Sequence, residues 1–317
     1  MSETIEGLVS SYFGARQRYL LTGDTAGFQR LLAPGVWAGF EAPELRALRS
    51  PLLKRGIQVT DCDLAVTWRM SQQRGSWLVE AIENLVLTAT ASGWPGYLQS
   101  QVANAGHHLR CRPVKGRWVV VELSSDNDFT VGRPRIRRPV MRCRPPVISA
   151  ASPTAYDRPG AAAYALAWWN RRNPKYKDWT TAGGDCTNFT SQCLHEGGQA
   201  RMDPPAWYYY SASAWAPSWI VADAQNRYLL RPAPIRGPRA SLRERASELE
   251  LGDLIHYDFQ GDGRIDHTAI VTGFIYGLPL ITQHTVDARD LLWDKGAAKT
   301  YFLHIEGWDA GAVIPGG

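Results

Sequence analysis

Residues 183–189, Gly-Gly-Asp-Cys-Thr-Asn-Phe, combine a tight turn with the start of a helix. The two glycines allow backbone conformations that side chains disfavour, and Cys186 follows them where a helical pattern begins. Phe189 and Cys193 fall on the same helix face as Cys186, and Gly197 helps to end the pattern. The stretch therefore predicts a helix that begins at Cys186, buries one face and leaves the sulfur near the turn.

Patterns on either side extend this prediction to a domain over residues 156–317. Residues 161–172 are strong helix formers, Asp157 can cap their first turn, and Asn173-Pro174 ends the pattern. Three later apolar runs are typical of strands: 249–259, 268–274 and 278–283. The order of helices followed by antiparallel sheet predicts an α+β fold.

The first part of the chain predicts a smaller α+β domain over residues 1–128. An amphipathic helical pattern begins at Ile5, and the runs 77–88 and 118–123 are rich in β-branched and aromatic residues. Residues 129–155 are rich in arginine and proline, a composition typical of an extended linker. A chain of 317 residues is about twice the usual domain length, so we expect two domains.

Composition excludes several classes of partner. The net charge is +5, but six arginines between Arg133 and Arg144 account for the excess, and no aromatic residues interleave them to stack on bases. A solvated linker is therefore favoured over contact with nucleic acid or another anionic polymer. No stretch approaches the ~20 apolar residues of a membrane span, and the N-terminus lacks the features of a secretory signal. We expect no membrane partner, and a cytoplasmic location or export by another route.

Cys186 has the surroundings expected of a nucleophile. A cysteine attacks as the thiolate, and the pKa of its thiol falls at a helix N-terminus beside an imidazolium. His267 stands at the mouth of an apolar strand and is the predicted general base. His284 ends the next strand and is our first choice for the group that orients His267, with Gln283 second. Structural or solvated roles suit other histidines better: His107, His108, His195 and His304.

Metal binding competes poorly for the same residues. The five cysteines are odd in number and form no CxxC pair, which disfavours a disulfide framework and a zinc ribbon. Zinc held by Cys186, His267 and His284 would occupy the nucleophile. The loop from Asp258 to Asp266 imitates a calcium loop, but Ala269 stands where the bidentate glutamate belongs, so a polar hairpin is preferred. We expect no metal and no other cofactor.

Several motifs together resemble the bacterial putative amidase domain family of the papain-like cell-wall amidase and peptidase superfamily. They are Tyr156-Asp157-Arg158, Trp168-Trp169-Asn170, Asn173-Pro174-Lys175-Tyr176, residues 183–192, Gly252-Asp253-Leu254-Ile255 and Gln283-His284-Thr285. The resemblance implies a papain-like α+β fold, a thiolate nucleophile at Cys186 and a histidine base at His267. Residues 3–127 separately resemble the cone-shaped nuclear transport factor fold in the order of helix, variable middle and closing strand.

One departure concerns the oxyanion hole. Papain-like proteases carry a glutamine six residues before the nucleophile, and Thr180 stands there in this chain. The Cys186 amide, together with Asp185, Asn188 or Tyr176, is expected to replace it. Aromatic residues around Trp207 could line a substrate groove or pack in the core, and the spacing of Trp215 and Trp219 favours the core for those two.

The predicted function is hydrolysis of an amide bond through a thioacyl-enzyme, which makes the chain a cysteine hydrolase. Peptidoglycan stem peptides are the substrate that the family resemblance favours. Three alternatives stay open: acyl transfer or protein deamidation at the same site, a non-catalytic module that binds glycan or peptide, and an interaction protein that works through its N-terminal domain.

Overall fold

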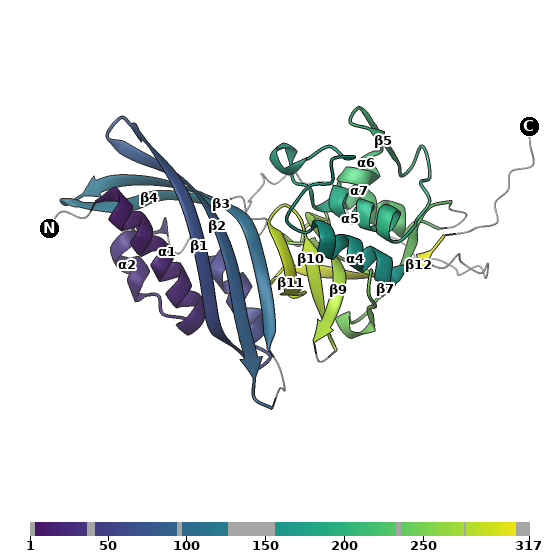
Figure 1. Ribbon diagram of the computed structural model, residues 1–317, viewed down its shortest axis with the longest axis horizontal. Helices are drawn as coiled ribbons and strands as arrows, with labels where there is room; N and C mark the ends of the chain where they lie inside the picture. The colour runs from purple at the N-terminus through teal and green to yellow at the C-terminus, as the bar shows by residue number, and fades with distance from the viewer. Residues whose placement is uncertain are drawn as a thin grey trace, which may run out of the picture. The chain divides into compact units, whose positions relative to one another are not determined.

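The computed structural model describes residues 4–36, 42–93, 97–125, 156–232, 236–275 and 277–308 (Figure 1). The chain divides into two compact units. The first contains residues 1–132 with the short segments 286–288 and 294–296, and the second contains the remainder. The predicted linker, residues 129–155, lies outside the described residues, so the predicted domain boundaries stay predictions. Within the described ranges, no helix is long and apolar enough to cross a membrane.

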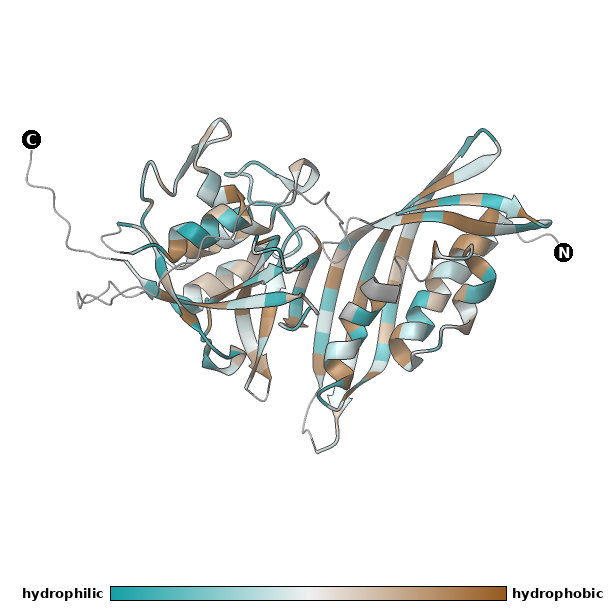
Figure 2. Ribbon diagram, turned by 180° about the vertical axis from the view of Figure 1, so that it is seen from behind, coloured by the Kyte–Doolittle hydropathy of each residue, from teal (hydrophilic) through white to brown (hydrophobic). Residues whose placement is uncertain are grey.

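The first unit packs helices against a meander of long antiparallel strands. Its helices are α1 (Ile5–Thr22), α2 (Ala26–Leu31) and α3 (Ala42–Leu53), and its strands are β1 (Ile57–Gln73), β2 (Ser76–Ala91), β3 (Leu98–Val114) and β4 (Arg117–Ser125). Each strand pairs with the next in antiparallel register. Hydrophilic and hydrophobic residues alternate along these strands in Figure 2, as expected when one sheet face is covered. The predicted first helix and the two predicted strands are confirmed, while the cone-fold resemblance stays a prediction.

The second unit contains helices first and a sheet afterwards, as predicted. Its helical elements are α4 (Arg158–Trp168), η2 (Thr180–Ala182), α5 (Cys186–Gln192), η3 (Cys193–Gly197), α6 (Pro217–Ile220), α7 (Ala222–Leu229) and η4 (Ala246–Glu248). Its strands are β5 (Tyr209–Ser211), β6 (Ala214–Trp215), β7 (Arg239–Arg243), β8 (Leu254–Asp258), β9 (His267–Ile275), β10 (Leu278–Gln283), β11 (Asp287–Leu292) and β12 (Lys299–Gly307), of which β11 has its first two residues in the first unit. The main sheet runs in the order β11-β10-β9-β8-β12-β7, and β5 pairs with β6.

The strand predicted at 249–259 is shorter than expected. Strand β8 begins only at Leu254, because Gly252 adopts a φ of 79° in a turn and Asp253 turns its carboxylate back to the amide of Glu250. Strands β9 and β10 match their predicted ranges closely and pair antiparallel. The outcome is a mixed helix and sheet unit with a large antiparallel sheet.

Helices α4 and α5 pack on β9 and β10, and this layer contains the core of the second unit. Phe189 of α5 is fully buried among residues that include Trp207, Trp219, Leu254 and Ile270. Burying a side chain of this kind contributes about 1.5–3 kcal/mol. The face of α5 that carries Phe189 is therefore fixed against the sheet, which fixes the position of Cys186 at the start of the helix.

Candidate active site

The predicted helix start at Cys186 is confirmed. Gly183 and Gly184 adopt φ values of 112° and 104°, Asp185 stands at the N-cap, and α5 begins at Cys186. The helix continues without a break into η3. Cys186 is buried with 7% of its surface exposed, and its sulfur lies 3.7 Å from the Thr187 hydroxyl oxygen. The double glycine turn therefore places the sulfur at the head of the helix.

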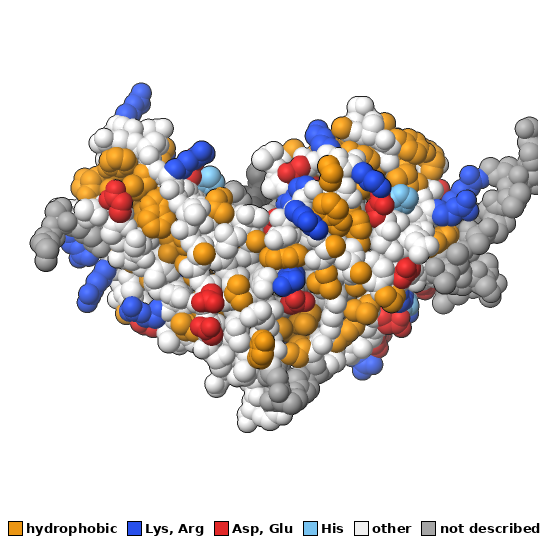
Figure 3. Space-filling view, in the orientation of Figure 1, with side chains coloured by type: hydrophobic (Ala, Val, Ile, Leu, Met, Phe, Trp, Pro, Cys, Tyr) orange, Lys and Arg blue, Asp and Glu red, His pale blue; other side chains and the backbone are white. Residues whose placement is uncertain are grey.

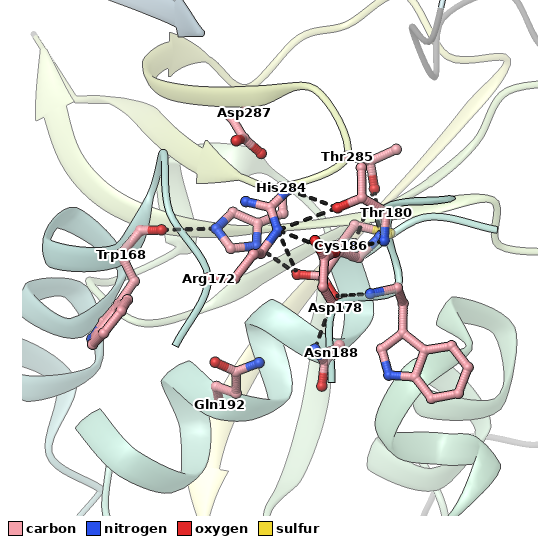
Figure 4. A network of polar contacts seen from close by, with 12 residues as sticks. Trp168, Arg172, Asp178, Thr180, Cys186, Asn188, Gln192, His284, Thr285 and Asp287 are labelled. Carbon is pink, nitrogen blue, oxygen red and sulfur yellow. Dashed lines mark hydrogen bonds and ion pairs between the residues drawn. The ribbon is translucent and has the colours of Figure 1, made fainter. Parts of the chain in front are cut away.

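The amides at this helix start have an acceptor that the sequence did not predict. Thr285 Oγ1 accepts hydrogen bonds from the backbone N–H of Asp185 at 3.0 Å and of Cys186 at 3.1 Å (Figure 4). We expected the Cys186 amide to be available to an oxyanion. In the structure it is occupied by the side chain of a residue in the turn after β10.

His267 is the first residue of β9 and is fully buried. Its Nε2 lies 3.0 Å from the side-chain oxygen of Gln283, the last residue of β10. An amide oxygen only accepts, so this contact places the proton on Nε2 and makes Nδ1 the nitrogen that can take a proton. The rings of Tyr257 and Phe259 lie beside the imidazole, with centroids 5.7 and 6.4 Å away. Gln283, our second choice, is thus the residue that contacts the predicted base.

His284 contacts other groups. Its Nδ1 lies 2.7 Å from Asp185 Oδ2, its Nε2 lies 2.8 Å from the Trp168 carbonyl oxygen, and its ring stacks on Phe189 with centroids 3.8 Å apart. Both ring nitrogens thus face oxygen acceptors other than His267, and they hold the start of α5 to the end of α4. The orienting role of His284 toward His267 stays a prediction.

Asp185 is the centre of a buried polar network. Its Oδ1 accepts from the Trp179 amide at 3.1 Å and from Asn188 Nδ2 at 2.8 Å. Its Oδ2 faces His284 and lies 3.4 Å from Arg172 Nε. The Arg172 guanidinium also donates to the Thr180 hydroxyl (Figure 4). Thr180, which stands where papain-like proteases carry glutamine, therefore supports this network.

Asn188 and Tyr176, two further predicted site residues, also have structural partners. Asn188 donates to the Lys177 carbonyl at 3.1 Å and accepts from the Trp219 indole at 3.1 Å. Tyr176 donates to Glu196 at 2.7 Å and stacks on Trp219. Burial, and then the hydrogen bond to Glu196, raise the pKa of the Tyr176 phenol well above its usual value. Both side chains thus support the helix layer, and their contact with an oxyanion stays a prediction.

The aromatic stretch alternates between core and surface. Trp207 is fully buried in the core and donates to the Ser191 hydroxyl, and its contact with substrate stays a prediction. Trp219 is also buried, as predicted. Tyr210 is 64% exposed and its ring lies 4.8 Å from that of Tyr208. Figure 3 shows hydrophobic side chains gathered near β5 and α6, where these tyrosines lie.

A seventh histidine, His256, lies close to the predicted base but carries no motif in the sequence. It lies in β8, fully buried, with Nε2 3.2 Å from Gln225 Oε1 and Nδ1 3.0 Å from Asn226 Oδ1. Burial, and then the charge of His267, lower the pKa of His256 to about 3. Its position two residues into an apolar run was the available signal. A neutral His256 therefore lies in the same strand pair as the predicted base.

The predicted polar hairpin connects β8 to β9. Asp258 accepts hydrogen bonds from the backbone N–H of Gly261, Asp262 and Gly263, and Asp266 accepts from the Phe259 amide. These carboxylates order the turn that precedes His267. Among the described residues, no group of three or more metal-binding side chains gathers at one place.

The comparisons with known proteins agree with the class of chemistry. Residues 155–305 match a family model described as "Putative amidase domain", which suggests a hydrolase that acts on amides. The chain is also 41% identical over 161 residues to the "Uncharacterized protein YhbB" of Bacillus subtilis (strain 168). That match covers 47% of this chain and 50% of the relative, so the chain spans about half the length of the curated relative it matches.

Proposed function

We propose that the second unit hydrolyses an amide bond, with Cys186 as the nucleophile and His267 as the general base. The observation that carries the proposal is the contact between His267 Nε2 and Gln283 Oε1 at 3.0 Å. It selects the tautomer whose Nδ1 can accept a proton from a thiol, and it mounts the ring between two paired strands against which α5 packs.

The reaction follows from these roles. His267 takes the proton of the Cys186 thiol, and the thiolate attacks the carbonyl carbon to form a tetrahedral adduct. The C–N bond breaks as His267 gives the proton to the departing amine, which leaves a thioester on Cys186. Water then gives a proton to His267 as its oxygen adds to the carbonyl carbon of the thioester. The C–S bond breaks, the sulfur of Cys186 takes the proton back from His267, and the acid is released.

The substrate class rests on family resemblance. The matched amidase region supports amide hydrolysis, and peptidoglycan stem peptides are the substrate we propose within that class. The side chains of Asn188, Tyr176 and Trp207 each form a hydrogen bond within the protein, so none of these bonds is made to a substrate. The exposed Tyr210, with the half-buried Tyr208 beside it, is better placed to meet an incoming polymer.

The test compares the wild type with Cys186→Ala on purified peptidoglycan and on a peptide amide library, with new termini read by mass spectrometry. We expect release of an acid and an amine by the wild type and none by the variant. Cys193→Ala is the matched control, because Cys193 lies in the same helical segment, fully buried, and burial raises the pKa of its thiol well above normal. Turnover that survives in Cys186→Ala would contradict the proposal.

The same products separate the related chemistries. Transfer of the acyl group to an added amine would indicate an acyl transferase, and conversion of protein glutamine to glutamate would indicate a deamidase. Binding of peptidoglycan with no new termini would instead favour a non-catalytic module.

A further inference from the structure

The hydroxyl of Thr285 lies where two backbone amides converge. The N–H groups of Asp185 and Cys186 donate to the same oxygen at 3.0 and 3.1 Å. A pair of amides directed at one oxygen at this distance is the arrangement that stabilises the anionic oxygen of an acyl-transfer adduct. A threonine hydroxyl oxygen has two lone pairs, and both are used by these donors. The side chain thus holds the position that a substrate oxygen would need beside Cys186.

The contact persists at a cost in backbone conformation. Thr285 has a φ of 87° in the turn after β10, a conformation that β-branched residues rarely adopt and that glycine or asparagine normally supplies in turns. Across from it, Gly184 has a φ of 104°, and a Cβ there would lie 2.9 Å from Thr285 Oγ1. A strained threonine and a glycine that leaves room for its hydroxyl, in distant parts of the sequence, therefore accommodate this contact.

We propose that the Thr285 hydroxyl is an internal occupant of the oxyanion position and that the carbonyl oxygen of a substrate displaces it. Thr285 is then a positioning residue that controls acylation of Cys186, and the proposal rests on the function proposed above. Displacement exchanges a neutral acceptor for a developing anion, which forms stronger hydrogen bonds to the same amides. It also allows the turn to leave its positive φ.

The experiment uses two electrophiles on the full chain. Iodoacetamide alkylates a thiolate by direct displacement and forms no oxyanion, whereas p-nitrophenyl acetate acylates it through a tetrahedral oxyanion. The ratio of acylation rate to alkylation rate at Cys186 therefore reports on the oxyanion position, and a change in thiolate reactivity alone cancels. Signal from other groups is subtracted with Cys186→Ala.

Three substitutions at Thr285 give opposite expectations. Thr285→Gly removes the occupant and suits the positive φ, so the ratio should rise about tenfold. This rise corresponds to about one net hydrogen bond gained by the oxyanion at the two amides together. Thr285→Val keeps the volume without the acceptor, so the ratio should fall below that of the wild type. Thr285→Ser keeps the hydroxyl and should bring the ratio back toward the wild-type value.

A control and two contrary outcomes complete the test. Lys115→Gly relieves a φ of 50° at an exposed turn of the first unit and should leave the ratio unmoved. If Thr285 only caps α5, Gly and Val will slow both reactions in parallel, and an unchanged ratio overturns the inference. If Cys186 reacts with neither reagent, even in Thr285→Gly, the proposed function and the inference both fail. Normal reaction at Cys186 with an unmoved ratio removes the inference alone.

Discussion

Each unit of this protein buries a carboxylate between an arginine and a histidine. In the first unit, Glu83 Oε2 lies 2.8 Å from Arg16 Nη2 and 2.7 Å from His107 Nε2. Burial alone would raise the pKa of Glu83, but Arg16 and His107 outweigh it and lower that pKa to about 2. In the second unit, Asp185 is held in the same way by Arg172 and His284.

The two clusters differ in what lies beside them. Cys62 is near the first cluster, where burial and then the charge of Glu83 raise the pKa of its thiol to about 12. Cys186 directly follows the carboxylate of the second cluster and begins a helix. A cluster of arginine, carboxylate and histidine therefore indicates that buried polar groups have hydrogen-bond partners, and does not by itself mark an active site. The second cluster contributes to a candidate active site because it anchors the turn that presents a cysteine and two amides.

The largest expected difference is in thiol reactivity. At pH 7 a thiol with a pKa of about 12 is ionised in about one molecule in 10⁵, against about one in thirty for an ordinary cysteine. Iodoacetamide should therefore label Cys186 at least about a thousandfold faster than Cys62 in the folded chain. Peptide mapping by mass spectrometry measures both sites in one sample, and equal labelling would remove the distinction between the clusters.

Removing the central charge should destabilise both units but affect only one chemistry. Glu83→Gln removes the carboxylate charge beside the buried Arg16 and should lower the free energy of unfolding by about 3–5 kcal/mol. Asp185→Asn should lower it by less, because Arg172 is half-buried and also lies 3.5 Å from Asp178. Hydrogen exchange locates the loss in β2 and β3 or in α5. Only Asp185→Asn should also slow alkylation of Cys186. An equal slowing by Glu83→Gln would contradict the division of roles.

A smaller effect is expected from the amide that contacts the base. Gln283→Leu removes the partner of His267 Nε2, and misplacement of the ring should lower kcat about a hundredfold. Gln17→Leu is the control, because Gln17 donates to the Cys62 carbonyl in the first unit. Turnover by Gln283→Leu at the wild-type rate would show that another group orients His267.

The smallest effect, taken per pH unit, is a dependence of stability on pH. The pKa of His256 is about 3 in the folded chain against an ordinary 6.5, so between these values only the unfolded chain binds the proton. The free energy of unfolding should fall on acidification through this window by up to about 1.4 kcal/mol per pH unit. Urea titrations at several pH values measure this dependence. The free energy of unfolding of His256→Gln should change less with pH than that of the wild type. An identical dependence on pH in both proteins would exclude His256 as the source.

The sequence was informative where the physics is local. The helix start at Cys186 and the strands that carry His267 and Gln283 follow from turn residues and apolar periodicity over a few positions. Strands β7, β11 and β12 were missed because they interleave charged residues with short apolar runs, and their pairing comes from neighbours distant in sequence.

The partners of His284 and Thr285 could not be predicted in that way. Neighbouring residues at the end of a strand point to opposite faces, so only one of Gln283 and His284 could face His267. Periodicity did not reveal which, because the choice depends on Asp185 and Trp168, which lie 99 and 116 residues away from His284. The motif Gln283-His284-Thr285 did not indicate a role for Thr285, because its hydroxyl contacts Asp185, which lies 100 residues away in the sequence.

The absence of a side chain at Gly184 has an evolutionary consequence. Since a Cβ at this position would meet the Thr285 hydroxyl, each of the two residues limits what the other can become. Relatives that carry alanine or serine at the equivalent of 184 should carry glycine or another small residue at the equivalent of 285. Anyone who transplants the turn before Cys186 into another scaffold must move both positions together.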